Sequence, residues 1–199
     1  MVRKMRSLNS YIIEKFQVSP DNIRRYAYTP KDKYELMEYI KEKIKKEGLG
    51  TKDKPLDLND IDTSKITDMS NLFDLMGSNI RELVNLSKNG NFDISEWDVS
   101  NVTSMYSMFY CSAFNGDISN WDVSNVENMR WMFAGSYFDG NISKWDVSNV
   151  ENMDSMFRYS RFTGKKGDIS DWDVTNVKGM INMFNKCPLE DNPPKWYKL

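Results

Sequence analysis

The hydrophobic positions of this chain recur as one short pattern along most of its length. In the stretch Asp117 to Gly140, the apolar residues are Ile118, Trp121, Val123, Val126, Met129, Met132, Phe133 and Phe138. Copies of the pattern begin at residues 93, 117, 141 and 168, and a degenerate copy begins at residue 57. A period of 24 to 27 residues is typical of solenoids, in which each repeat forms one coil and stacks on its neighbours.

Each repeat combines two hydrophobic periods. Trp121 and Val123 flank one polar residue, the alternation of a short strand with inward side chains. From residue 126 to residue 133 the apolar spacing becomes three, three and one, which predicts about two turns of helix. Ser124, with Glu127 three residues on, has the pattern of a capping box. Stacking would then align an inner ladder of tryptophans, comprising Trp97, Trp121, Trp145 and Trp172.

The repeated core WDVSNVxxMxxMF, with FNGDIS between copies, resembles the BspA-like leucine-rich-repeat family. That family is common in bacterial surface proteins, protists and some phages. The resemblance covers about residues 57 to 187. It implies an α/β fold, a right-handed leucine-rich-repeat-like solenoid of short parallel strands and short helices. It also implies a role in adhesion or protein binding, with no catalytic residues to transfer.

The N-terminal residues 1–55 are predicted to form a helical, basic capping segment. Thr29 as N-cap, Pro30 at the first helical position and Gly48 as the stop mark one helix. Its expected apolar stripe comprises Tyr34, Met37, Ile40 and Ile44, with Leu36 alongside. Because an opening coil exposes an apolar edge, we expect this helix and the preceding segment 11–16 to cover it. The alternative is a dimer or partner-binding face.

Two further segments depart from the repeat. Residues 77–90 are an excess between the first two copies, with apolar residues at helical spacing, and insertions in solenoids often carry binding. Residues 188–199 contain three prolines, which prevent another coil, so this segment is predicted to be a C-terminal cap. Trp196 and Tyr197 are available to cover the last coil.

Charge differs between the two parts of the chain. Residues 1–55 contain 14 Lys and Arg against 8 Asp and Glu, net +6, and the remainder contains 13 against 21, net −8. The basic part allows a contact with nucleic acid or an acidic protein, but interleaved glutamates favour a solvated helix face. Its basic residues include Arg3, Lys4, Arg6, Arg24, Arg25, Lys41, Lys43, Lys45 and Lys46.

The sequence argues against an enzyme and against a resident cofactor. It contains no histidine, which removes the commonest general base and every Ser-His or Cys-His nucleophile. It also contains no phosphate-binding loop, no GxGxxG and no CxxC. Cys111 and Cys187 lie three coils apart, too far for a disulfide, which predicts reduced thiols. No run of 18 apolar residues occurs, so membrane insertion is not expected.

One acidic residue recurs at the same place in every repeat. We interpret it first as a structural corner in which each carboxylate accepts backbone amides. An acidic binding strip, which would mimic nucleic acid, and a metal site are the alternatives. The strip consists of Asp62, Asp98, Asp122, Asp146 and Asp173.

Positions that vary between repeats are free to serve a partner. Tyr, Trp and Arg are enriched at interface hot spots, and Trp131 stands where other repeats have Ser107, Ser155 and Asn182. Trp131 is therefore the first candidate contact, with gap filling between helices as the alternative. The predicted partner-binding residues are Trp131, Arg130, Tyr106, Tyr110, Tyr137, Arg158, Tyr159 and Arg161.

These features favour a non-catalytic scaffold that binds another protein through several repeats. The first residues are basic but lack an apolar segment and cleavage site of a secretory signal, which favours a cytoplasmic location in a host cell. One hypothesis is a phage or mobile-element protein that inhibits a host defence complex. The alternative is an adhesin-type surface module whose export signal is missing from this sequence.

Overall fold

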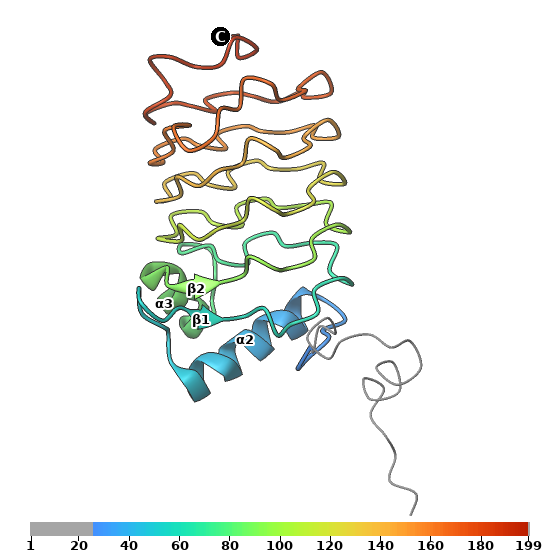
Figure 1. Cartoon of the computed structure of the whole chain (residues 1–199), viewed down its shortest axis with the longest axis vertical. Helices are drawn as coiled ribbons and strands as arrows, with labels where there is room; N and C mark the ends of the chain where they lie inside the picture. Colours follow the sequence, from blue (N-terminus) through green and yellow to red (C-terminus); the bar gives the residue numbers. More distant parts are fainter. Residues whose placement is uncertain (1–25, 199) are drawn as a thin grey trace, which may run out of the picture.

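The structure, a computed structural model, describes residues 26–198. From residue 57 onward the chain runs in successive coils that stack along one axis (Figure 1). Parallel bridges join equivalent positions of neighbouring coils, namely Asp68, Ser104, Asn128, Asn152 and Gly179. The steps between these positions are 36, 24, 24 and 27 residues, which are also the steps between the starts of the sequence copies. Each sequence copy is therefore one coil of the stack.

Ladders of aromatic side chains fill the inside of the stack. Phe73, Phe109, Phe133, Phe157 and Phe184 lie one above another, with neighbouring ring centroids 5.5, 5.7 or 5.9 Å apart. The four repeat tryptophans are buried, as predicted. Each also donates its indole N–H to a carbonyl of the preceding coil, for example from Trp121 Nε1 to the Ile94 oxygen at 3.1 Å. The coils are therefore joined inside by both packing and hydrogen bonds.

The two-turn helix predicted for residues 126–133 is wrong. After a bridge at Asn128 the chain forms turns from residue 130 to residue 135. Alternate amides bond to the next coil, as from Ser107 N to Arg130 O at 3.0 Å. The intervening amides close turns within the coil, as from Met108 N to Met105 O at 3.1 Å. Because half of the amides serve the neighbouring coil, they cannot form the bonds to the fourth residue back that define an α-helix.

The predicted strand around Trp121 and the capping box after it are also absent from this coil, where residues 121–123 are irregular. Ser124 does not cap a helix, because its hydroxyl donates to Asp122 Oδ1 at 2.6 Å. The two described strands are short and lie elsewhere. Strand β1 (Leu56–Asp57) pairs in parallel with β2 (Phe92–Asp93).

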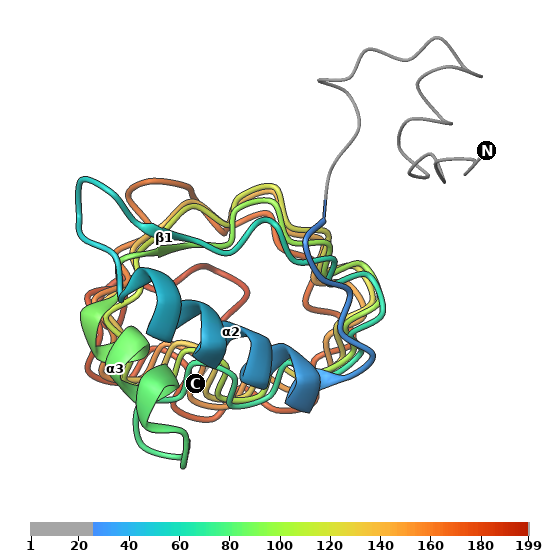
Figure 2. The same ribbon diagram turned by 90° about the horizontal axis from the view of Figure 1, so that it is seen from below.

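Helix α2 (Lys33–Glu47) crosses the N-terminal end of the stack (Figure 2). Its buried residues are Leu36, Ile40 and Ile44, which are four apart and so form one stripe. Tyr34, predicted to belong to this stripe, is instead 74% exposed, because it lies nearly opposite Leu36 around the helix. The helix therefore contributes an apolar face to the core of the first coils.

The predicted C-terminal boundary of α2 is confirmed, whereas the predicted N-terminal boundary is wrong. Gly48 is the C-cap, as predicted, and its N–H bonds to the Ile44 carbonyl at 2.8 Å. The N-cap is Asp32 rather than Thr29, and Pro30 precedes the helix. The Asp32 carboxylate accepts the Glu35 N–H at 2.9 Å, so it satisfies a first-turn amide. The expectations for Arg3, Lys4, Arg6, Arg24, Arg25 and segment 11–16 lie outside the described residues.

The inserted segment and the C-terminal segment both pack on the stack. Helix α3 (Arg81–Asn89) lies beside α2 and ends at Gly90, which has left-handed backbone (φ 73°) (Figure 2). Trp196 stacks on Trp172 with ring centroids 6.3 Å apart and donates its indole N–H to the Ile169 carbonyl at 2.9 Å. It thus continues the tryptophan ladder over the last coil.

Candidate partner-binding site

Four of the eight predicted contact residues line one cavity of about 240 Å³ on the side of the stack. They are Tyr110, Trp131, Arg158 and Tyr159. Trp131 and Arg158 are half-buried, whereas Tyr159 is 51% exposed. The remaining lining residues, which the sequence comparison did not identify, are Cys111, Ala134, Gly135 and Ser155.

Other predicted residues stack on the rings that line the cavity. The rings of Tyr106 and Tyr110 lie 6.3 and 5.7 Å from that of Trp131, centroid to centroid. The Arg130 guanidinium lies 5.2 Å from the Trp131 ring. Such contacts hold aromatic side chains in fixed positions. The structure therefore brings Tyr106, Tyr110, Arg130 and Trp131 into one cluster.

Three further cation-ring pairs involve predicted residues, and two of them share the Tyr159 ring. The Arg158 guanidinium is 4.9 Å and the Lys186 ammonium 5.1 Å from the Tyr159 ring centroid. Arg161 lies 3.6 Å from the Tyr137 ring centroid, and this pair does not line the cavity. We call the eight predicted residues together with Lys186 the Trp131 surface.

The cavity follows from two columns of residues with left-handed backbone. The first column contains Ser107 (φ 52°), Trp131 (60°), Ser155 (56°) and Asn182 (57°), and the second contains Cys111 (56°), Gly135 (68°), Tyr159 (58°) and Lys186 (56°). Each is a third position of a tight turn, where φ is positive. The second column lacks a side chain only at Gly135, where a Cβ would come within 2.9 Å of Cys111 Sγ. The hollow thus forms where Gly135 lies between larger neighbours.

The cations of the Trp131 surface lack acidic partners. Among residues 26–198, none of Arg130, Arg158, Arg161 and Lys186 forms an ion pair. By contrast, five lysines in and near α2 do, namely Lys31, Lys33, Lys41, Lys43 and Lys45. A hydrogen bond from Lys186 and the nearby Arg158 charge lower the pKa of Tyr159. The surface therefore presents uncompensated positive charge.

A family model described as "Mycoplasma protein of unknown function, DUF285" matches residues 78–196, more than half of the chain. The chain belongs to this family. No curated protein and no solved structure matches it. The whole cavity lies inside the DUF285 match. The family description names no activity.

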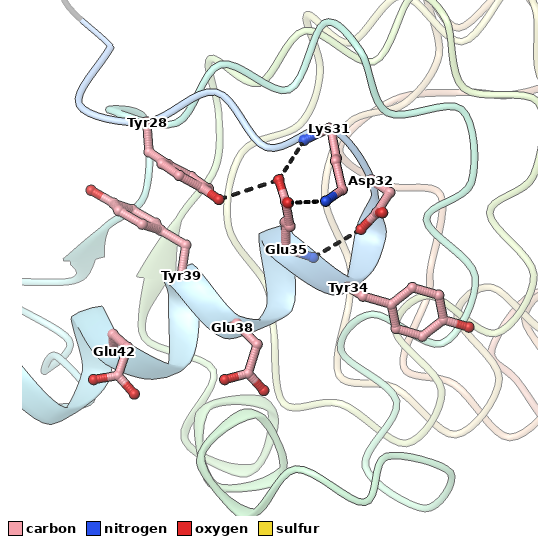
Figure 3. A pocket seen from close by; sticks show the side chains of 8 residues that line it. All are labelled: Tyr28, Lys31, Asp32, Tyr34, Glu35, Glu38, Tyr39 and Glu42. Atoms are coloured by element: carbon pink, nitrogen blue, oxygen red, sulfur yellow. Dashed lines mark hydrogen bonds and ion pairs between the residues drawn. The ribbon is translucent and has the colours of Figure 1, made fainter.

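A second hollow, of about 460 Å³, lies on the outer side of α2 and outside the DUF285 match. Figure 3 shows Tyr28, Tyr39 and three glutamates around it. Here the charges are already paired. Glu35 accepts the Tyr28 hydroxyl at 3.3 Å and pairs with Lys31, while Glu38 and Glu42 pair with lysines one turn on. This arrangement favours a solvated helix face over a contact for nucleic acid.

The aspartates of the predicted acidic strip each form the same local corner. In Asp62, Asp98, Asp122, Asp146 and Asp173, Oδ1 accepts both the backbone N–H and the side-chain hydroxyl of the residue two positions on. The geometry therefore favours the structural-corner interpretation. Within residues 26–198, no three Cys, Asp or Glu side chains are grouped so as to hold a metal ion. No helix in that range is both long and apolar enough to cross a membrane.

Acid should weaken these corners. Hydroxyl donors, from Ser148 to Asp146 and from Thr175 to Asp173, hold the pKa of each carboxyl below its ordinary value of 3.8. A lowered folded-state pKa contributes stability that is present above the unfolded pKa and lost as pH falls through the folded pKa. We expect the melting temperature, followed by circular dichroism, to be level above roughly pH 5 and to fall below about 3.8. A D146N/D173N variant should show a shallower fall, and a pH-independent melting temperature would contradict this account.

Of the residues that sequence reasoning missed, Lys186 carried a signal. It occupies the same column as Cys111, Gly135 and Tyr159, and this column varies from coil to coil as the predicted contact positions do. Comparing that column would have identified it. Gly135 could not be identified in this way. It contributes to the cavity only because it has no side chain to fill it.

Trp131 combines an unfavourable backbone with favourable stacking. Left-handed backbone costs an ordinary L-residue about 1–2 kcal/mol, and Asn tolerates it best. Stacking on Tyr106 and Tyr110 offsets this by about 0.5–1.5 kcal/mol for each ring pair. Because Trp131→Asn loses stacking but relieves strain, we expect its free energy of unfolding to stay within about 1 kcal/mol of wild type. A loss above roughly 3 kcal/mol in urea titrations would instead make Trp131 a core residue.

Proposed function

We propose that this protein is a non-catalytic scaffold that binds another protein through the Trp131 surface. The observation that carries the proposal is that six of the eight predicted contact residues gather at one cavity, four in its lining and two, Tyr106 and Arg130, stacked on Trp131. They come from positions that vary between coils, whereas the invariant positions build the core and corners. Aromatic and Arg side chains around a shallow hollow are the usual composition of an interface hot spot.

We further propose that the stacked coils are a leucine-rich-repeat-type solenoid of the BspA-like kind. The WDVSNV core, the parallel bridges and the 24-residue steps support this relation. The coils differ from the predicted repeat in one respect, because turns replace the short helices. Stacked coils expose one long surface, which suits binding distributed over several repeats.

Partner capture tests the proposed function. Tagged protein is incubated with lysate of the organism that carries the gene, and bound proteins are compared between wild type and Trp131→Asn. Tyr34→Ala is the matched control, because it removes an exposed ring on α2. We expect one stoichiometric partner that Trp131→Asn loses and Tyr34→Ala keeps. Equal capture by all three proteins would overturn the assignment of this surface.

The same assay tests the acidic-strip alternative. A variant with Asp98, Asp122 and Asp146 replaced by Asn keeps an oxygen acceptor at each corner but removes three charges. Asn141 accepts from Ser143 in the same way at 3.0 Å, so Asn fits such a corner. Capture is expected to survive these replacements. Its loss would favour a partner that reads the strip.

A further inference from the structure

We propose that the segment of the partner bound by the Trp131 surface is a short acidic peptide with one bulky apolar anchor side chain. The inference rests on the proposed function and names the chemistry of its partner. Two independent observations carry it: the apolar hollow between Trp131 and Tyr159, and the unpaired cations around it.

The hollow has the size and lining of a site for one side chain. Its volume of about 240 Å³ is below the usual range of about 300–1,000 Å³ for small-molecule pockets. Its lining includes the aromatic residues Tyr110, Trp131 and Tyr159 and the small residues Ala134 and Gly135. Burial raises the pKa of both the Tyr110 hydroxyl and the Cys111 thiol, so these groups stay neutral at physiological pH. An apolar side chain of the size of Leu, Phe or Trp suits such a lining.

The surrounding cations are positioned to bind carboxylates. Arg130, Arg158 and Arg161 each lie over an aromatic ring, an arrangement that leaves guanidinium N–H groups at the edge for a partner. Arg158 Nε donates to the neutral Asn185 Oδ1 at 3.3 Å, which leaves the charge of its guanidinium unpaired. Guanidinium groups bind carboxylates in a bidentate manner. Acidic residues of the peptide next to its anchor side chain would therefore pair with these guanidinium groups, which form no ion pair within the described part of the chain.

Two carboxylates near this surface form no ion pair with its cations among the described residues. Asp74, whose charge acts on Tyr110 and Cys111, accepts the backbone N–H groups of Met76 and Gly77 at 2.7 and 2.9 Å. Glu190 lies next to Lys186 but accepts from the backbone N–H of Lys186 at 2.8 Å and from Asn185 Nδ2 at 2.9 Å. It forms no ion pair with the Lys186 ammonium in the part of the chain that is described. The ammonium remains over the Tyr159 ring, where it adds to the field of the arginines.

Charge also favours a peptide over a nucleic acid. Stacked aromatic rings with arginines resemble the platforms that bind single strands. However, residues 56–199 have a net charge of −8, so a long polyanion would meet repulsion once it left the Trp131 surface. A short acidic segment contacts the basic area alone. The peptide is therefore the occupant that we argue for.

Selection from a random dodecapeptide display library on the full-length protein tests the inference. We expect enriched peptides to contain one Leu, Ile, Phe or Trp next to several Asp or Glu residues. Fluorescence anisotropy of the most enriched peptide should show about 10-fold weaker binding to R130Q/R161Q, because two exposed ion pairs are lost. The control K144Q removes an exposed lysine away from the cavity and should change affinity less than about 2-fold.

Each other outcome counts against the inference. Enriched peptides without an excess of acidic residues, no enrichment at all, or equal binding by R130Q/R161Q would overturn it. Tighter binding of a twelve-nucleotide oligothymidylate than of the peptide would replace it with a nucleic-acid site. If lysate capture still depends on Trp131 in these cases, only the acidic-peptide inference fails. If lysate capture does not depend on Trp131 either, the proposed function fails as well.

Discussion

Replacing Trp121 by alanine is expected to lower the free energy of unfolding by about 3–5 kcal/mol. The side chain is only 4% exposed and its ring lies 6.4 Å from that of Phe109, centroid to centroid. Its removal leaves a cavity in the middle of the stack and withdraws the hydrogen-bond donor of the Ile94 carbonyl. Urea titration followed by circular dichroism measures the change.

Trp121→Phe separates the two contributions. Phenylalanine keeps most of the ring but cannot donate to Ile94, so its cost should be smaller, about 1–3 kcal/mol. An Ala variant as stable as wild type would show that the tryptophan ladder does not hold the coils together.

Ile40→Ala is expected to cost about 2–5 kcal/mol, the second largest effect. Ile40 is fully buried on the face of α2 that meets the first coils, so its truncation opens the N-terminal end of the core. Tyr34→Ala on the same helix is the matched control, since an exposed side chain should change stability by no more than about 0.5 kcal/mol. Equal effects of the two variants would show that α2 does not contribute to the core. Thermal unfolding monitored by calorimetry distinguishes the outcomes.

The repeat period and the inward tryptophans could be predicted because packing alone determines them. A side chain such as Trp121 that recurs in all four complete copies must occupy the same place in each of their coils. The local backbone could not be predicted in the same way. The apolar spacing from Val126 to Phe133 is compatible with a helix. It is equally compatible with the observed turns, in which the backbone N–H of Ser107 and its equivalents donates to the next coil. That choice depends on contacts between coils, which no single repeat contains.

The same distinction applies at α2 and at the site. Thr29 and Asp32 are both good N-caps by residue type. In the fold, Tyr28 pairs with Ile61 of the first coil and the helix begins after Asp32, and this long-range pairing is not visible in the helix sequence. At the site, variation between copies predicted Trp131, Arg158 and Tyr159 as contact residues. Surface positions that do not support the fold can differ from one repeat to the next. The hollow itself was not visible in the sequence, since it depends on Gly135 being flanked by Cys111 and Tyr159 across coils.

Photo-crosslinking tests most directly the central claim that a partner protein binds the Trp131 surface. A benzophenone amino acid replaces Tyr159, at the edge of the cavity, or Lys144, an exposed residue that does not line it. Both proteins are irradiated in lysate and analysed by mass spectrometry. We expect a single crosslinked partner from position 159 and none from position 144. A partner crosslinked only from position 144 would contradict the account and place binding on another face.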